Sequence, residues 1–147
     1  MAKNSSNQHL GNVGRPEEAA TPAQLDFELE FFGRMLERNP DYIDVLRVHG
    51  NNLTAKGLYA RGLDTDRRLV RLRPHDPLAH YNLACSYSLL RMNDAAIASL
   101  ESSFKLGYRD FEHMLCDPDL EHVRGDARFL GLMSRYLKKL IRARKAR

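Results

Sequence analysis

Residues 81 to 87 read Tyr-Asn-Leu-Ala-Cys-Ser-Tyr, and this stretch decides the fold. Asp76 and Pro77 precede it, and these residue types are preferred at the cap and in the first turn of a helix. Large apolar side chains then recur at helical spacing, interrupted by a turn at residues 91–94. Residues 77–107 therefore predict two antiparallel helices joined by a short turn.

The preceding stretch repeats this arrangement. Apolar side chains at helical spacing mark one helix over residues 43–57 and a second over residues 58–73. Pro40, which ends an amphipathic run over residues 24–39, stands 34 residues before Pro74. A fixed period of this length indicates an array of helical repeats.

In this register the chain resembles the tetratricopeptide repeat (TPR) family. The resemblance covers about residues 24–133 and is strongest over residues 74–107. The family pattern requires, in order, a bulky residue, Leu, a small residue, Tyr, Ala, an aromatic or large apolar residue and Ala. At these positions the second repeat (77–108) carries His80, Leu83, Ala84, Tyr87, Ala96, Leu100 and Ser103.

The first repeat (43–76) matches the pattern less well. It keeps small residues, Gly50 and Gly62, at positions where two helices approach closely. It departs from the pattern at His49 and Asp66, where polar side chains stand at core positions. We interpret His49 as a packed histidine and not as a catalytic base.

The resemblance implies an all-α fold, a TPR-like α-solenoid of antiparallel helix hairpins. We expect a disordered lead-in at residues 1–22, a helical domain over 23–134 and a capping helix with a basic tail over 126–147. Residues 24–39 would form an N-terminal half-repeat helix. The last helix carries an apolar stripe that the last hairpin is expected to cover, made of Phe129, Leu132, Met133, Tyr136, Leu137, Leu140 and Ile141.

In TPR proteins the first helix of each repeat lines a concave groove, so the resemblance also names a ligand-binding face. Arg47, Asn51 and Asn82 stand where TPR domains that grip a C-terminal carboxylate carry a cation and two amides. The other two positions of that clamp hold Glu112 and Cys116, so we favour a general peptide groove over a carboxylate clamp. The residues expected to face the groove are Asp44, Arg47, Asn51, Thr54, Ala55, Leu78, Tyr81, Asn82, Cys85, Ser88 and Leu89.

The end of the chain is strongly basic. The net charge is +4, but the last thirteen residues hold seven cations and no acid, so the rest of the chain is slightly acidic. Such a tail can bind RNA, an acidic partner or an anionic membrane surface, although cations also suit the last turns of a helix. No aromatic residue follows Tyr136, which leaves no stacking platform for single-stranded nucleic acid. The candidate polyanion-binding residues are Lys138, Lys139, Arg142, Arg144, Lys145 and Arg147.

The sequence contains no motif for catalysis, for a metal or for a cofactor. Phosphate-binding loops, dinucleotide fingerprints and zincin motifs are missing, so we expect no enzyme and no cofactor. His113, Cys116 and His122 have ligand-type side chains, but their spacing matches no structural zinc pattern. No apolar stretch approaches a membrane span or a signal peptide, and the two cysteines suit a reducing compartment. We therefore predict a cytoplasmic protein.

The sequence thus favours a non-catalytic adaptor or scaffold that binds a peptide or another protein in a TPR groove. Two alternatives remain open. The basic tail could bind RNA or another polyanion, with the repeats serving as a mount. The protein could also be a structural subunit that assembles into a homo-oligomer through its repeat ends, for example through residues 24–39.

Overall fold

The computed structural model describes residues 19–147, and every element in this range is helical. The predicted lead-in therefore falls mostly outside the described residues, and its last residue, Pro22, already begins the first helix. The elements are α1 (Pro22–Arg38), α2 (Ile43–Ala55), α3 (Tyr59–Leu72), α4 (Pro77–Leu89), α5 (Asn93–Lys105), α6 (Phe111–Cys116), the 3-10 turn η1 (Pro118–Leu120), α7 (Glu121–Arg124) and α8 (Ala127–Lys145).

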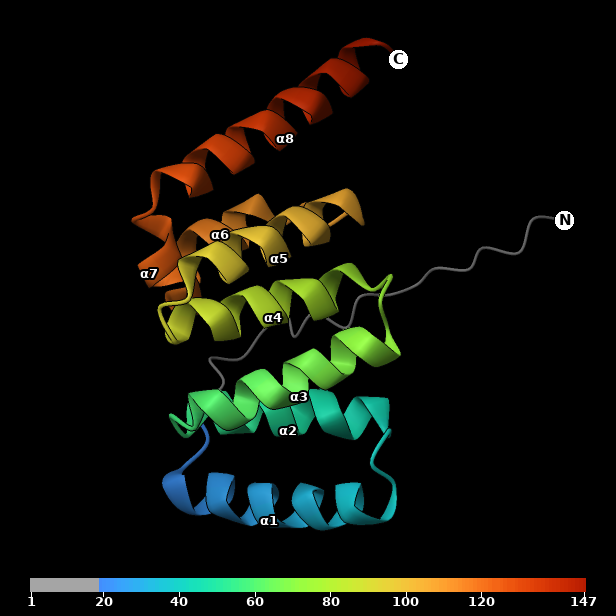
Figure 1. Cartoon of the computed structure of the whole chain (residues 1–147), viewed down its shortest axis with the longest axis vertical. Helices are drawn as coiled ribbons and strands as arrows, with labels where there is room; N and C mark the ends of the chain where they lie inside the picture. The colour runs from blue at the N-terminus through green and yellow to red at the C-terminus, as the bar shows by residue number, and fades with distance from the viewer. Residues whose placement is uncertain (1–18) are drawn as a thin grey trace, which may run out of the picture.

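The helices are stacked in chain order, with α1 at one end of the molecule and α8 at the other (Figure 1). Each helix from α1 to α4 packs on the next one, and α8 packs on α5 and α7. The pairs α2–α3 and α4–α5 are the two antiparallel hairpins that the sequence predicts. The short elements η1 and α7 lie against α4.

Local sequence explains where these helices begin and end. The side chain of Asp76 caps α4 by accepting a hydrogen bond of 2.9 Å from the backbone N–H of Leu78. Gly57 follows α2 with φ +82° and Gly107 follows α5 with φ +109°, a conformation that favours glycine. The turn inside the second hairpin uses Arg91 in the same region, at φ +60°.

Two clusters of buried side chains form the core. The larger one joins α4 and α5 to α6, η1, α7 and α8, and Phe104 and Phe129 are fully buried in it. The smaller one, between the first hairpin and the start of α4, consists of Leu46, Leu69 and Ala79. Partly buried side chains of α1, α2 and α3 pack around the smaller cluster.

The small residues have the packing role that the sequence suggests. A Cβ atom on Gly50 would lie 3.2 Å from Thr65 Cγ2, and one on Gly62 would lie 3.1 Å from Thr54 Oγ1. These distances are closer than ordinary contacts between carbon atoms or between carbon and oxygen. Glycine at both positions therefore allows α2 and α3 to approach each other closely.

The last helix differs from the prediction. Phe129, Leu132 and Tyr136 are buried against the body, as expected for a capping helix. Leu137 and Ile141 are each 47% exposed, because the second half of α8 slants away from the helices that it packs on (Figure 1). The expectation that the last hairpin covers the whole apolar stripe is therefore wrong.

No helix within residues 19–147 is both long enough and apolar enough to cross a bilayer. The longest, α8, has 19 residues, and cations are spread along it.

Candidate functional site

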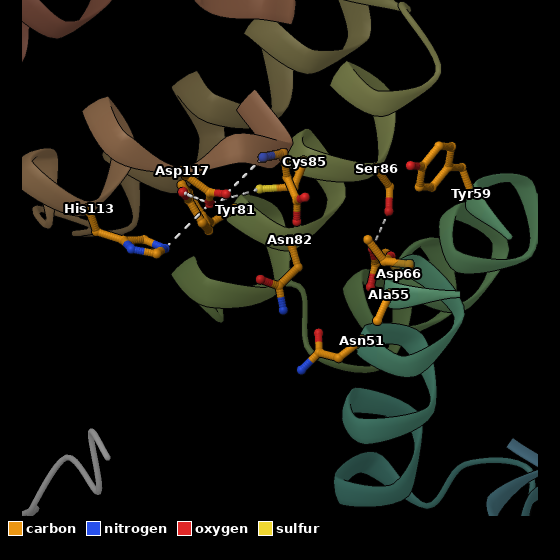
Figure 2. Close-up of a pocket in the computed structure, with 12 residues that line it drawn as sticks. Asn51, Ala55, Tyr59, Asp66, Tyr81, Asn82, Cys85, Ser86, His113 and Asp117 are labelled. Carbon is orange, nitrogen blue, oxygen red and sulfur yellow. Dashed lines mark hydrogen bonds and ion pairs between the residues drawn. The ribbon is translucent and has the colours of Figure 1, made fainter. Parts of the chain in front are cut away.

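A hollow of about 400 Å³ opens where α2, α3, α4 and the segment from α6 to η1 meet (Figure 2). Neighbouring positions on one helix face come three or four residues apart, which groups the side chains of α2 on one wall and those of α4 on another. Six residues of the predicted groove line this hollow: Asn51, Thr54, Ala55, Tyr81, Asn82 and Cys85.

Two amide side chains stand on the open side of the hollow. Asn51 on α2 is exposed and Asn82 on α4 is half-buried. Figure 2 shows the two amides in the same open space, between the helices that carry them. An amide group donates and accepts hydrogen bonds, so this pair can bind a peptide backbone in either direction.

Asp117 organises the closed side of the hollow. Its Oδ1 accepts a hydrogen bond of 3.0 Å from the backbone N–H of Asp119, which caps η1. Its Oδ2 accepts one of 2.5 Å from the hydroxyl of Tyr81, and the Sγ of Cys85 lies 3.7 Å away. His113 Nε2 lies 3.3 Å from the same oxygen. These contacts attach the α6–η1 segment to α4.

The Tyr81 hydroxyl and the Cys85 thiol, which face Asp117, act as hydrogen-bond donors and not as nucleophiles. Burial raises the pKa of Tyr81 far above its ordinary value, and neighbouring groups that include Asp117 add to the effect. Burial also raises the pKa of Cys85, again with Asp117 contributing. Both groups therefore stay protonated at neutral pH, and a protonated, buried thiol is a poor nucleophile.

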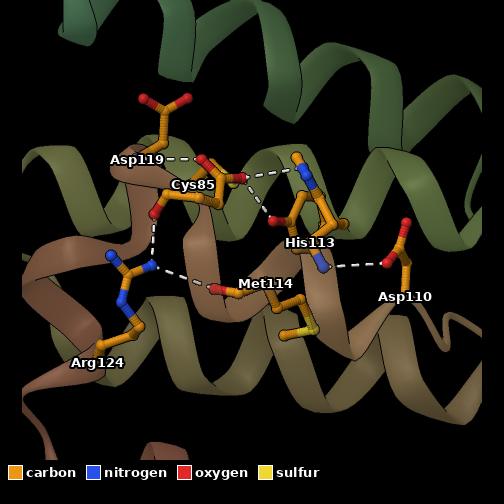
Figure 3. Close-up of polar contacts among 8 residues, drawn as sticks. Cys85, Asp110, His113, Met114, Asp119 and Arg124 are labelled. Carbon is orange, nitrogen blue, oxygen red and sulfur yellow. Dashed lines mark hydrogen bonds and ion pairs between the residues drawn. The ribbon is translucent and has the colours of Figure 1, made fainter. Parts of the chain in front are cut away.

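Arg124 of α7 holds the same segment through hydrogen bonds to its backbone (Figure 3). Its Nη1 donates to the backbone carbonyl of Met114 at 3.1 Å and also to the backbone carbonyl of Asp117. Asp110 caps α6 by accepting from the backbone N–H of His113 at 3.0 Å. The wall formed by α6 and η1 is thus fixed by polar contacts as well as by its buried apolar side chains.

A second carboxylate enters the hollow from α3. Asp66 is 7% exposed, and its Oδ2 accepts a hydrogen bond of 2.6 Å from the hydroxyl of Ser86. Burial raises the pKa of Asp66 to about 6, the hydrogen bond from Ser86 opposes the rise, and the negative charge of Asp119 adds to it. Asp66 is one of the two positions at which residues 43–76 depart from the TPR pattern that the sequence resembles.

A third carboxylate makes the hollow acidic. Burial raises the pKa of Asp119, the neighbouring Asp117 raises it further, and His113 lowers it. Among the described residues, no lysine or arginine lines the hollow. Sequence reasoning missed this acidic character, although the departure at Asp66 was a signal that could have indicated it.

Of the three residues that match a carboxylate clamp, the two amides, Asn51 and Asn82, line the hollow, but the cation does not. Arg47 does not line the hollow, because its Nη2 donates to Asp76 at the start of α4. Burial raises the pKa of Asp76, but the hydrogen bond and the charge of Arg47 outweigh this and lower it below its ordinary value. Glu112 and Cys116 are exposed on α6, outside the hollow. Arg47 thus holds the second hairpin against the first and is not free to bind a ligand carboxylate, which agrees with the preference for a general peptide groove.

Other predicted groove residues lie elsewhere. Ser88 is fully buried, and its Oγ accepts a hydrogen bond of 3.2 Å from the backbone N–H of Val123. The prediction that Ser88 faces a ligand is therefore wrong, because α7 covers it. Ser88 and Leu89 border a second hollow of about 890 Å³ beside η1 and α7. Leu78 and Asp44 are exposed but lie outside the first hollow.

The candidate polyanion-binding residues are all exposed on or just beyond the second half of α8. A shallow hollow of about 340 Å³ on this helix is lined by Gly131, Ser134, Arg135, Lys138, Lys139 and Arg142. The Nζ of Lys139 lies 4.9 Å from the centre of the Tyr136 ring. Arg142, Arg144 and Lys145 occupy the last turn, where cations are favoured by the helix dipole.

Among residues 19–147, no three histidine, cysteine or acidic side chains converge so as to hold a metal ion. His113 lies beside Asp117. Cys116 is the last residue of α6 and is exposed to solvent. His122 borders the second hollow, not the first.

No protein-family model matches the chain. The chain is similar to a chloroplastic protein of Arabidopsis thaliana, with 32% identity over 90 residues. The similarity covers 59% of this chain and 27% of the relative. The chain thus spans about a quarter of the length of the curated relative that it matches.

Proposed function

We propose that the chain is a non-catalytic adaptor of the TPR kind, which binds an extended segment of a partner protein in the hollow between α2 and α4. The observation that carries this proposal is the hollow itself, which two successive hairpins and the α6–η1 segment border together. Asn51 and Asn82 bind the backbone of the segment. The cytoplasmic location and the absence of catalysis that the sequence suggests stay predictions.

The charge of the hollow selects the kind of segment. Asp66, Asp117 and Asp119 line it, and Arg47, the cation that the sequence placed on this face, is engaged with Asp76. A partner carboxylate would be repelled there, whereas a lysine or arginine side chain would be attracted in a partly enclosed site. The partner segment is therefore basic.

A displayed library of random peptides tests this function without a known partner. The library is panned against the wild type and counter-selected against Asn51→Ala/Asn82→Ala, and the affinity of the enriched peptides is measured by fluorescence anisotropy. We expect peptides rich in lysine or arginine. Their Kd should rise about 30-fold in the double variant, because each lost hydrogen bond is worth roughly 1 kcal/mol.

The matched control is Asn39→Ala/Ser134→Ala, which changes two exposed polar side chains outside the hollow. The control should bind the enriched peptides as the wild type does, and all three proteins should unfold at similar temperatures. Peptides that bind equally well to the double variant would contradict the groove. Enrichment of acidic peptides or of free C-terminal carboxylates would contradict the basic partner.

A further inference from the structure

The outer face of α8 carries a line of exposed aliphatic side chains. Leu130 is 61% exposed, and Leu137 and Ile141 are each 47% exposed. Their spacing of seven and four residues places them along one side of the helix. Phe129, Leu132 and Tyr136 are the buried part of the same apolar stripe, so this line is the edge of the stripe that the body of the protein leaves uncovered.

Cations flank this exposed line. Arg135, Lys138 and Arg142 follow one another at helical spacing on the side of α8 that lines the shallow hollow of about 340 Å³. The helix contains no acidic residue of its own. Arg135 lies 3.6 Å from Glu101 of α5, but no ion pair within residues 19–147 includes Lys138 or Arg142.

The position of α8 makes this face accessible. The helix closes one end of the stack, and its outer side points away from every other helix (Figure 1). Its inner side is held by α5 and α7, so it presents a single long face and not its whole circumference. One long exposed face of this kind can lie against a flat surface.

We propose that the outer face of α8 binds an anionic lipid surface. Leu130, Leu137 and Ile141 enter the boundary between headgroups and acyl chains, while Lys138 and Arg142 lie at the level of the lipid phosphates. A helix with an aliphatic line beside a basic face binds membranes in this orientation, through buried apolar area and attraction to anionic lipids together. This inference concerns α8 alone and does not depend on the hollow between α2 and α4.

The same observations disfavour the other polyanions. Binding to RNA would use the cations but would leave the aliphatic line in water, and the aromatic ring available for base stacking, Tyr136, is 6% exposed. An acidic protein that encloses a helix in a groove needs most of the helix circumference, which α5 and α7 occupy over the first half of α8.

The chain contains no tryptophan, so a single introduced tryptophan reports on one position. The full chain carrying Leu137→Trp is mixed with phosphatidylcholine vesicles and with vesicles that also contain phosphatidylglycerol. We expect a blue shift of the emission, and quenching by lipids with brominated acyl chains, only with the anionic vesicles. The matched control is Leu115→Trp, on the exposed side of α6, which should show neither effect.

Charge is tested by vesicle co-sedimentation of Lys138→Gln/Arg142→Gln. Each cation near an anionic surface contributes about fivefold in affinity, so this variant should bind about 25-fold more weakly. The control Arg38→Gln/Arg71→Gln removes the same charge from exposed positions on α1 and α3 and should bind almost as the wild type. Ile141→Ser should also weaken binding while circular dichroism stays unchanged.

Three results would overturn the proposal. The first is the absence of co-sedimentation with anionic vesicles. The second is co-sedimentation without a blue shift of Leu137→Trp, which would mean that the contact is purely electrostatic. The third is binding to a single-stranded RNA that is as strong as binding to the vesicles and insensitive to Ile141→Ser, which would assign α8 to nucleic acid. None of these results would affect peptide binding in the hollow.

Discussion

The two hairpins have the same outline but different interiors. The second, α4–α5, belongs to a cluster of twelve buried residues that extends to Tyr136 of α8. The first, α2–α3, is centred on the much smaller cluster of Leu46, Leu69 and Ala79. The second hairpin is therefore part of a larger continuous cluster of buried apolar side chains than the first.

The first hairpin also places polar groups where the second places apolar ones. His49 and Asp66 are each 7% exposed, and His49 Nδ1 has no hydrogen-bond partner within residues 19–147. Burial lowers the pKa of His49, and the charge of Arg61 lowers it further. The comparison teaches that a departure from the repeat pattern need not mark a missing element. Asp66, one of the two departures, faces the candidate binding site, where local rules are often broken.

The largest effect should come from truncating a core side chain in each hairpin. Phe104→Ala should lower the free energy of unfolding by about 3 to 5 kcal/mol, because it leaves a cavity in the larger cluster. Leu46→Ala should lower it by about 2 kcal/mol, because half-buried neighbours such as Leu36 of α1 can move into the space. Urea denaturation followed by circular dichroism measures both.

Phe27→Ala is the control, since Phe27 is 67% exposed, and it should change the stability by no more than about 0.5 kcal/mol. Equal losses for Phe104→Ala and Leu46→Ala would show that the two clusters contribute alike and would break the comparison.

A smaller effect should come from Asp66, the buried acid of the first hairpin. Its pKa is about 6 in the folded protein and 3.8 as the ordinary value, so the folded state binds the proton more tightly. The contribution of Asp66 to the free energy of unfolding therefore falls as the pH rises from about 4 to about 6. Above that range the charged carboxylate destabilises the fold. Asp66→Asn should raise the free energy of unfolding at pH 7.5 by roughly 1 to 3 kcal/mol and leave it almost unchanged at pH 4.

The measurement is urea denaturation of wild type and variant across this pH range. Asp64→Asn, at an exposed position two residues earlier on α3, is the control and should leave the pH dependence as in the wild type. A destabilised Asp66→Asn protein at pH 7.5 would mean that the carboxylate is needed for the fold and not for a ligand.

The smallest effect should come from the inner turns of the two hairpins. Gly57 and Arg91 both adopt positive φ, at +82° and +60°, and only glycine does so without steric cost. Arg91→Gly should therefore raise the thermal midpoint by a few degrees, for a gain of about 0.5 kcal/mol. The reciprocal Gly57→Ala should lower the stability by about 1 kcal/mol. A lower thermal midpoint for Arg91→Gly, measured by calorimetry, would show that the second turn is not strained.

Much of the fold follows from local signals in the sequence. Asp76 and Pro77 mark the start of α4, and Gly57 and Gly107 follow α2 and α5, because capping and left-handed turns depend on a few neighbouring atoms. The spacing of apolar residues likewise predicts every long helix. The candidate site was predicted in part, since Asn51 and Asn82 do line the hollow.

The rest could not be predicted because it depends on which segments meet. The sequence places Arg47 and Ser88 on the groove face. It does not show that Arg47 pairs with Asp76 or that α7 covers Ser88. It also gives no sign that Asp117 and Asp119 come to lie near Asp66, since about fifty residues separate them from it in the chain.

By itself, then, the sequence determined the helices, their order and the two hairpins, because periodicity, caps and turn residues act over a few positions. Only the tertiary structure decided the charge of the hollow and the exposure of the outer face of α8. Both depend on which elements from distant parts of the chain pack against each other. Burial, hydrogen bonding and pKa are set by those tertiary contacts and not by neighbouring residues in the sequence.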